Sequence, residues 1–366
     1  MRVDRRPWSL LLLHPLAGLT LVSVSALACY GQAAPADPAV PLSMLTNDNS
    51  AQRLELTKEG SPDLKSLSTA YDNAAQRYLA RHLYPDALKY FLLHYDACKR
   101  AFGESHPTSA RALNHVGQVY FLQGQYLQAQ SFFQRALKIS ELNGDANVTV
   151  ILLNNVGVVG VQLGDFSAAQ RAFEKAAAFY ETQRPADPGL GLLLNNFAQL
   201  EEGVGNLDAA MAIAGRAASI LEKRPPSQDL ALSLTLIGKF RMRQGDFAGA
   251  EKAFERSRRC LQQTGDEETV VGAAALRQLA KLYAATRRQR EAEPLFKHAI
   301  QIDERFTSPD LIQALKDYAA FLRATKRKHE AKELEAELHA RSEKFLQDNP
   351  SGHVVDVRTL LREQRH

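Results

Sequence analysis

The sequence is poor in the residues and motifs on which most enzyme active sites and disulfide-stabilised domains depend. Its 366 residues include three cysteines and one tryptophan. Three cysteines, spread over positions 29, 98 and 260, cannot supply the disulfide framework of a small secreted domain. The chain also has no Gly-rich phosphate loop, no HExxH helix, no GxSxG elbow and no CxxC pair. We therefore expect no catalytic residue, no metal site and no cofactor.

No strong charge of one sign is present either. The formal net charge is +4, and residues 231–366 hold 25 Lys and Arg against 20 Asp and Glu, which gives +5. Residues 29–230 hold 17 against 20, which gives −3. Solvated helix faces carry charges in this proportion, so we expect no nucleic-acid partner.

The first 28 residues differ in kind from the rest of the chain. Arg2, Arg5 and Arg6 precede an apolar stretch without charge that ends on the small-residue pattern Ala26-Leu27-Ala28. A basic segment, an apolar segment and a small-x-small cleavage site are the marks of an export signal, so residues 1–28 are predicted to be a signal peptide.

The residues around Cys29 extend this prediction. "SALAC" resembles a bacterial lipobox, and the resemblance implies lipidation of Cys29 and a periplasmic protein anchored to a membrane of the cell envelope. A cleaved signal with a secreted product and a retained membrane anchor are the alternatives. Residues 29–64, which include "AAPADPAVP", are predicted to be an extended tether and lead-in.

A repeated pattern fills most of the remaining chain. "LNNVGVVGVQLGDFSAAQRAFEKA" at 153–176 returns 41 residues later as "LNNFAQLEEGVGNLDAAMAIAGRA", and seven such copies align on one alanine. Small residues recur at the eighth position of each copy and Ala at the twentieth. The eighth positions are Ala75, Gly117, Gly157, Ala198, Gly238, Ala280 and Ala319; the twentieth are Ala87, Ala129, Ala169, Ala210, Ala250, Ala292 and Ala331. Phe recurs at the twenty-fourth position and Gly at the fifteenth: Phe91, Phe133, Phe173, Phe254 and Phe296; Gly124, Gly164, Gly205 and Gly245.

This pattern resembles the tetratricopeptide repeat. Its period is closest to the longer repeats of kinesin light chains, as in "HPTSARALNHVGQVYFLQGQYLQAQSFFQRALKI" from His106 to Ile139. The resemblance implies an all-α fold, a right-handed α-solenoid superhelix of about seven helix hairpins over residues 65–345. We expect the last repeat to act as a cap, because Glu335 replaces the recurring Phe, and residues 346–366 to form a C-terminal extension.

The resemblance also assigns positions 2, 5, 9 and 12 of each first helix to the concave groove, with position 6 near its edge. Its predicted peptide-binding residues are Asn114, Gln118, Asn154, Asn155, Asn195, Asn196, Gln199, Lys239, Arg277 and Lys281. An amide offers a donor and an acceptor together, which suits the backbone of an extended peptide. Lys and Arg beyond the amides could bind a carboxylate. The alternative is that the Asn residues bond to neighbouring helices and stabilise the stack.

The sequence thus predicts a non-enzymatic scaffold that binds a protein or peptide partner in its groove. An accessory subunit of an envelope secretion or assembly machine, docking through its convex face or loops, is the alternative. His94 and Cys98, four residues apart, are interpreted as a packed pair within a helix, and Cys98 and Cys260 as buried thiols.

Overall fold

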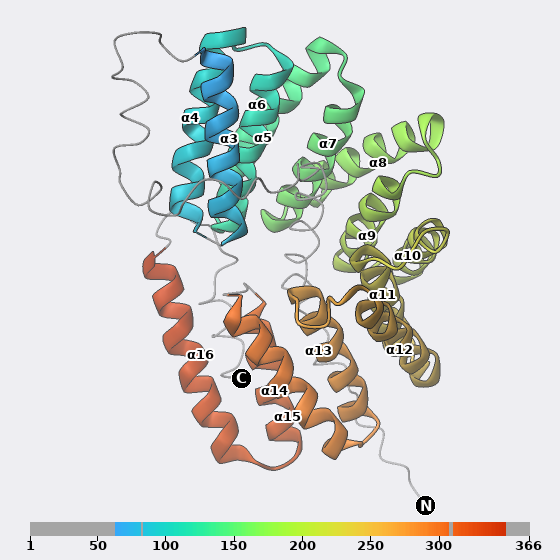
Figure 1. Ribbon diagram of the computed structural model, residues 1–366. Coiled ribbons are helices and arrows are strands. Elements are labelled where there is room, and N and C mark those ends of the chain that lie inside the picture. Colours follow the sequence, from blue (N-terminus) through green and yellow to red (C-terminus); the bar gives the residue numbers. More distant parts are fainter. Residues whose placement is uncertain (1–62, 82, 307–309, 349–366) are drawn as a thin grey trace, which may run out of the picture. The chain divides into compact units, whose positions relative to one another are not determined.

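The computed structural model describes residues 63–81, 83–306 and 310–348. Within these ranges the chain forms fourteen α-helices, labelled α3 to α16, and no strand (Figure 1). The predicted signal peptide, Cys29, most of the tether, His82 and the extension after Asp348 lie outside the described residues. None of the described helices is both long and apolar enough to cross a membrane.

The chain divides into two compact units, and the boundary falls at Leu152/Leu153, inside α7. The first unit covers residues 63–152 of the described chain. Its helices are α3 (Leu64–Ala80), α4 (Tyr84–Phe102), α5 (Pro107–Leu122), α6 (Tyr126–Asn143) and the first part of α7 (Ala146–Gln162). Helices α3 and α4 pack against each other, α4 packs against α5, and α5 packs against α6.

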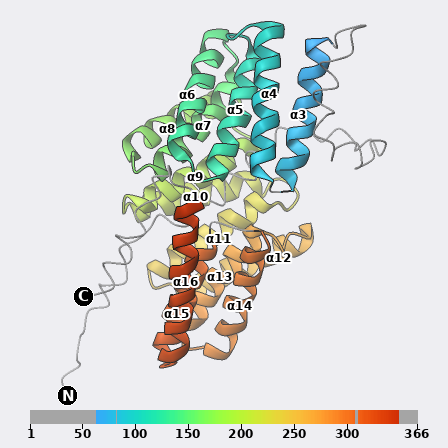
Figure 2. The ribbon, with the colours of Figure 1, turned by 90° about the vertical axis from the view of Figure 1, so that its left-hand side faces the viewer.

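The second unit covers residues 153–348. After the end of α7 it contains α8 (Phe166–Gln183), α9 (Pro188–Gly203), α10 (Leu207–Leu221), α11 (Gln228–Arg243), α12 (Phe247–Thr264), α13 (Val270–Ala285), α14 (Gln289–Arg305), α15 (Leu311–Ala324) and α16 (Lys328–Asp348). Successive helices pack as antiparallel pairs. The first helices of neighbouring hairpins also contact one another, so that α9, α11, α13 and α15 follow side by side (Figure 2).

The helices begin and end where the local sequence satisfies their free backbone groups. Asp165 accepts a hydrogen bond from the backbone N–H of Ala168 at 3.0 Å, and Ser227 accepts one from that of Leu230 at 3.2 Å. His106 caps α5 by accepting from the N–H of Thr108, and Pro107 follows at the first helical position. His106 and Pro107 thus mark the start of α5.

Turns between the two helices of a hairpin require a left-handed backbone at the fifteenth repeat position. Gly124, Gly164, Gly205 and Gly245 have φ values of 74°, 76°, 90° and 83° there. Arg287 and Lys326, which occupy the equivalent positions of the last two repeats, adopt the same conformation with φ values of 62° and 66°. The turn geometry is thus kept where the glycine is lost.

Contacts between small and aromatic positions form the core of five of the seven hairpins. The five recurring Phe side chains are at most 2% exposed, and the seven recurring Ala residues at position 20 are at most 1% exposed. Gly238 at position 8 lies directly under Phe254 of the same repeat, because a Cβ built on it would lie 2.5 Å from Phe254 Cε1. Gly157 and Phe173 show the same close approach at 2.5 Å. Burial of each Phe contributes about 1.5–3 kcal/mol.

Candidate functional site

The predicted groove residues lie on the first helix of each hairpin. The surface formed by the predicted groove residues within residues 153–348 is called the first-helix face. It consists of the side of α7 after Leu152, α9, α11, α13 and α15 on which these residues lie. Outside it, Asn114 and Gln118 belong to α5 of the other unit, where their side chains are 8% and 3% exposed. Those two residues are therefore described apart from the others.

The doubled Asn of α9 joins three successive repeats. Asn196 Nδ2 donates to Asn154 Oδ1 at 2.9 Å, across 42 residues of sequence. Asn195 Nδ2 donates to the backbone carbonyl of Asp229 at the start of α11, at 3.0 Å, and its Oδ1 accepts from Ser233 Oγ at 2.7 Å. Asn195 is completely buried and Asn196 is 2% exposed. These two amides therefore fasten α9 to α7 and to α11.

Other predicted amides are buried beside them. Asn155 is 4% exposed and Gln199 is 5% exposed. Gln199 Nε2 donates to the backbone carbonyl of Asn195 at 3.3 Å, within its own helix. Since this face buries its amides among helices, the structure supports the stacking role that the sequence left open as an alternative.

Arg277 in the sixth repeat makes the same kind of contact as Asn195 in the fourth, a hydrogen bond to the start of the next first helix. Both stand at position 5, and Arg277 Nη1 donates to the backbone carbonyl of Asp310 at 3.3 Å, just before α15 begins. The Arg277 side chain is 4% exposed. A position-5 donor that reaches the start of the next first helix is therefore a shared feature of these repeats.

The basic side chains predicted in the groove are paired with carboxylates of neighbouring repeats. Lys239 Nζ lies 2.7 Å from Glu202 Oε2, and Arg243 Nη1 lies 3.0 Å from Glu202 Oε1. The Glu202 side chain is 4% exposed, whereas those of Lys239 and Arg243 are 24% and 27% exposed. We call Glu202, Lys239 and Arg243 the α9/α11 cluster.

A second cluster of the same composition follows on the next pair of first helices. Arg277 Nε and Lys281 Nζ lie 3.8 and 3.4 Å from Asp317 Oδ2. Lys281 is 37% exposed, and Asp317 is 12% exposed. We call these three residues the α13/α15 cluster. Each cluster combines two cations with one carboxylate and so carries a net charge of +1 at neutral pH.

Burial changes the titration of two groups near this face. Burial raises the pKa of Asp229, whose backbone carbonyl binds Asn195, above its usual range. Burial also lowers the pKa of Lys316 on α15, with Asp317 opposing the shift. At the end of the face, Arg323 donates to Glu335 at 2.7 Å, so the residue that replaces the recurring Phe makes an ion pair instead.

Sequence reasoning missed the carboxylates that organise both clusters. In the same assignment that selected Lys239 and Arg277, Glu202 stands at position 12, in the groove, and Asp317 at position 6, near its edge. The repeat positions therefore identify both carboxylates as candidate site residues. They do not show that the carboxylate of one repeat faces the cations of a neighbouring repeat.

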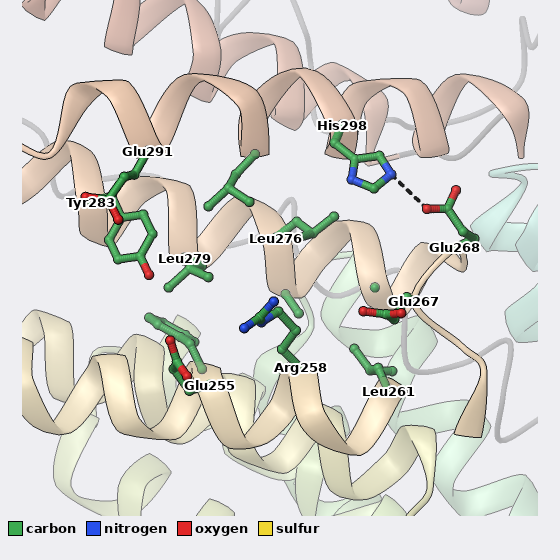
Figure 3. Close-up of a pocket in the computed structure, with 14 residues that line it drawn as sticks. Glu255, Arg258, Leu261, Glu267, Glu268, Leu276, Leu279, Tyr283, Glu291 and His298 are labelled. Atoms are coloured by element: carbon green, nitrogen blue, oxygen red, sulfur yellow. Dashed lines mark hydrogen bonds and ion pairs between the residues drawn. The ribbon is translucent and has the colours of Figure 1, made fainter. Parts of the chain in front are cut away.

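A cleft of about 480 Å³ opens on the other side of the hairpins, between α12, α13 and α14. Leu276, Leu279 and Leu295 contribute apolar surface, and Arg258 projects from α12 into the space (Figure 3). His298 closes one end through its 2.8 Å contact with Glu268. Sequence reasoning did not anticipate this cleft, because its lining comes from helices of two repeats.

Comparison with known proteins agrees with the hairpin architecture. The tetratricopeptide repeat model matches residues 66–142, 112–182 and 229–305, just over half of the chain. This chain belongs to the tetratricopeptide repeat family. The predicted family and the all-α repeat fold are therefore confirmed.

A plant relative carries repeats of the kinesin light chain kind. The protein KINESIN LIGHT CHAIN-RELATED 3 of Arabidopsis thaliana is 27% identical over 112 residues, which are 30% of this chain. Those residues span only 17% of the relative's length. The match thus concerns the repeats and not the whole relative.

Two solved structures share the fold over most of the chain. The Rap conjugation gene regulator of the plasmid pLS20, in complex with the Phr* peptide, has a TM-score of 0.63 at 15% identity and covers 88% of this chain and 82% of its own. Aspartyl phosphate phosphatase F from Bacillus subtilis has a TM-score of 0.62 at 15% identity, covering 78% and 72%. At this identity the likeness shows the fold alone.

Proposed function

We propose that this tetratricopeptide repeat protein is a non-enzymatic scaffold that binds an extended peptide, or an extended segment of a partner protein, along the first-helix face. We further propose, from residues 1–29, that it does so as an exported, membrane-anchored protein of the bacterial cell envelope. The two net-positive clusters on one face carry the first proposal, and the peptide complex of a protein with the same fold supports it.

The chemistry of the clusters defines the ligand. Glu202 is buried and Asp317 is only 12% exposed, and both hold the cations in place, so little side-chain entropy is lost when a ligand binds. One positive charge remains uncompensated in each cluster. A free C-terminal carboxylate or an acidic side chain is the group that such a cluster attracts. The buried amides keep neighbouring repeats in register and so maintain the spacing of the clusters.

An array of fluorescein-labelled heptapeptides tests the proposal against the full chain. Each sequence is presented twice, with a free C-terminal carboxylate and with a C-terminal amide, and binding is measured by fluorescence anisotropy. We expect a set of sequences to bind better as carboxylates. Lys239→Gln and Lys281→Gln should each weaken that binding by about 5- to 10-fold, which corresponds to about 1–1.4 kcal/mol.

The matched control is Lys252→Gln, which removes the same charge from an exposed position on the second helix α12. It should leave affinity unchanged. Equal binding of the two peptide forms, together with unchanged affinity in both cluster variants, would contradict the proposal. Phosphatase turnover by the purified chain would contradict its non-enzymatic part.

The cleft between α12 and α14 favours a second candidate function, that of an accessory subunit docking through its outer side. Its apolar floor, with Glu255, Glu267 and Glu291 at the rim, suits a partner segment that carries apolar and basic side chains. The same array separates the two candidates. Binding that is lost in Glu255→Lys and kept in Lys239→Gln would assign the interface to the cleft.

A further inference from the structure

Three helices of the first unit bring together side chains that the sequence leaves far apart. Asp72 comes from α3, His94 from α4 and His115 from α5. One carboxylate oxygen and one ring nitrogen from each His all lie within 4.8 Å of one another. The two imidazole rings are 6.4 Å apart and inclined by only 27°. Among the described residues, these three side chains are the ones placed closely enough together to hold a metal ion.

The contact between Asp72 and His115 already has the spacing of two ligands of one ion. Asp72 Oδ1 and His115 Nδ1 are 3.2 Å apart. Both atoms are shielded from solvent, yet neither makes a hydrogen bond of good geometry. Ligand atoms around a tetrahedral zinc ion, bound at about 2.0–2.1 Å, lie roughly 3.3 Å from each other. An ion between these two atoms would satisfy both without moving them apart.

His94 is oriented as a metal-binding histidine usually is. Its Nδ1 lies 2.8 Å from the backbone carbonyl of Ser68, which can only accept a hydrogen bond. Nδ1 therefore carries the proton, and Nε2, which lies 3.8 Å from Cys98 Sγ, is the nitrogen whose lone pair can turn to an ion. A second-shell carbonyl that fixes the tautomer and the ring plane is the common support of a histidine ligand.

The surroundings of the cluster leave it rigid on one side and accessible on the other. Phe91, which is fully buried, packs against the His115 ring at 5.0 Å. His94 is 9% exposed, whereas the side chains of His115 and Asp72 are 25% and 31% exposed. An ion can therefore enter from the Asp72 side, where His115, the less buried of the two rings, can turn to meet it.

We propose that Asp72, His94 and His115 form a binding site for a divalent transition-metal ion of the zinc class. Two imidazole nitrogens and one carboxylate oxygen suit zinc and its neighbours in the first transition row, whereas Ca²⁺ and Mg²⁺ prefer oxygen ligands alone. Closing the trio around an ion requires rotation of His94 or His115 by about an ångström at the ligand atom. The bound ion would tie α3 and α4 to α5, at the N-terminal end of the repeat array. This site is independent of the first-helix face.

Zinc titration of the full, metal-stripped chain tests the proposal by isothermal calorimetry. We expect one equivalent of ZnCl₂ to bind with micromolar or better affinity and to raise the melting temperature. His94→Gln, His115→Gln and Asp72→Asn should each weaken this binding by at least about 100-fold and abolish the thermal shift. Hydrogen exchange in α3 should slow on addition of zinc in the unaltered chain only.

The matched control is His298→Gln, which alters a surface His paired with one carboxylate, Glu268, at 2.8 Å. It should keep the full affinity of the site. Circular dichroism identifies any variant that fails to fold, and failure of the unaltered chain to bind zinc would overturn the proposal without the variants. The proposal is overturned if that chain binds no stoichiometric zinc at 10 μM, or if well-folded His115→Gln and Asp72→Asn variants bind it equally well.

Discussion

Asn195 shows how one side chain can determine the relation between repeats. Its amide donates to one group of the following hairpin and accepts from another, and no part of it is exposed. An Asn at this depth is tolerated because both ends of the amide are satisfied. Asn195 therefore links α9 to α11 by hydrogen bonds, and Asn196 links α9 to α7 in the same way.

Replacing Asn195 by Ala should lower the free energy of unfolding by about 2 kcal/mol. The substitution removes two buried hydrogen bonds and leaves a small cavity. Urea denaturation followed by far-UV circular dichroism measures the change. Gln170→Ala, at an exposed position of α8, should stay within about 0.5 kcal/mol of the unaltered chain. An equally small effect for Asn195→Ala would mean that the hydrogen bonds of Asn195 contribute little to the free energy of unfolding.

At the scale of the helix pair, the eighth and twenty-fourth positions decide how closely two helices approach. Gly117, Gly157 and Gly238 each lie under the Phe of their own repeat. Two other repeats combine Phe with Ala at this position, Ala75 with Phe91 and Ala280 with Phe296. Hairpins with Ala and hairpins with Gly are thus two packing solutions of one motif.

Gly238→Ala should destabilise the protein by about 1 kcal/mol, although Ala is the better helix former by about 1 kcal/mol. The new methyl group would lie 2.5 Å from Phe254 Cε1, so the ring must move before the helix propensity can act. Thermal unfolding measures the change.

Gly215→Ala on α10 is the matched comparison, because a Cβ there meets nothing within 4 Å. This variant should be more stable by about 0.5–1 kcal/mol. Stabilisation of similar size in both variants would show that the contact at Gly238 carries no strain.

At the scale of the molecule, the charge of the repeats changes along the chain. The amide-rich first helices α7 and α9 precede the Lys- and Arg-containing helices α11 and α13, and residues 231–366 carry a net charge of +5. All the cations of the two clusters lie in this basic part. Binding to it should therefore depend on electrostatic attraction more than binding to the amides would.

Added salt should weaken binding of carboxylate-ended peptides. We expect the dissociation constant to rise at least about fivefold between roughly 50 and 500 mM NaCl, because the Debye length falls from about 14 to about 4 Å. Anisotropy titrations of one selected peptide at four salt concentrations measure the slope. Lys281→Gln should flatten this slope and Lys252→Gln should not. A salt-independent constant would exclude the clusters as the binding groups.

The sequence by itself determined the repeat and therefore the fold. The recurring residues at positions 8, 20 and 24 pack against one another within a single hairpin. Because these contacts are local, they require the same residue types at the same spacing in each repeat, and such a pattern can be read from the sequence. The left-handed turns could be located in the same way, even at Arg287 and Lys326, where the glycine is missing.

Only the tertiary structure decided what the polar side chains do. Asn196 meets Asn154, Lys239 meets Glu202, and His115 meets Asp72, across 42, 37 and 43 residues of sequence. A repeat pattern shows which side of a helix a residue occupies. It does not show which partner the neighbouring helix presents, because the stacking of whole hairpins sets that pairing.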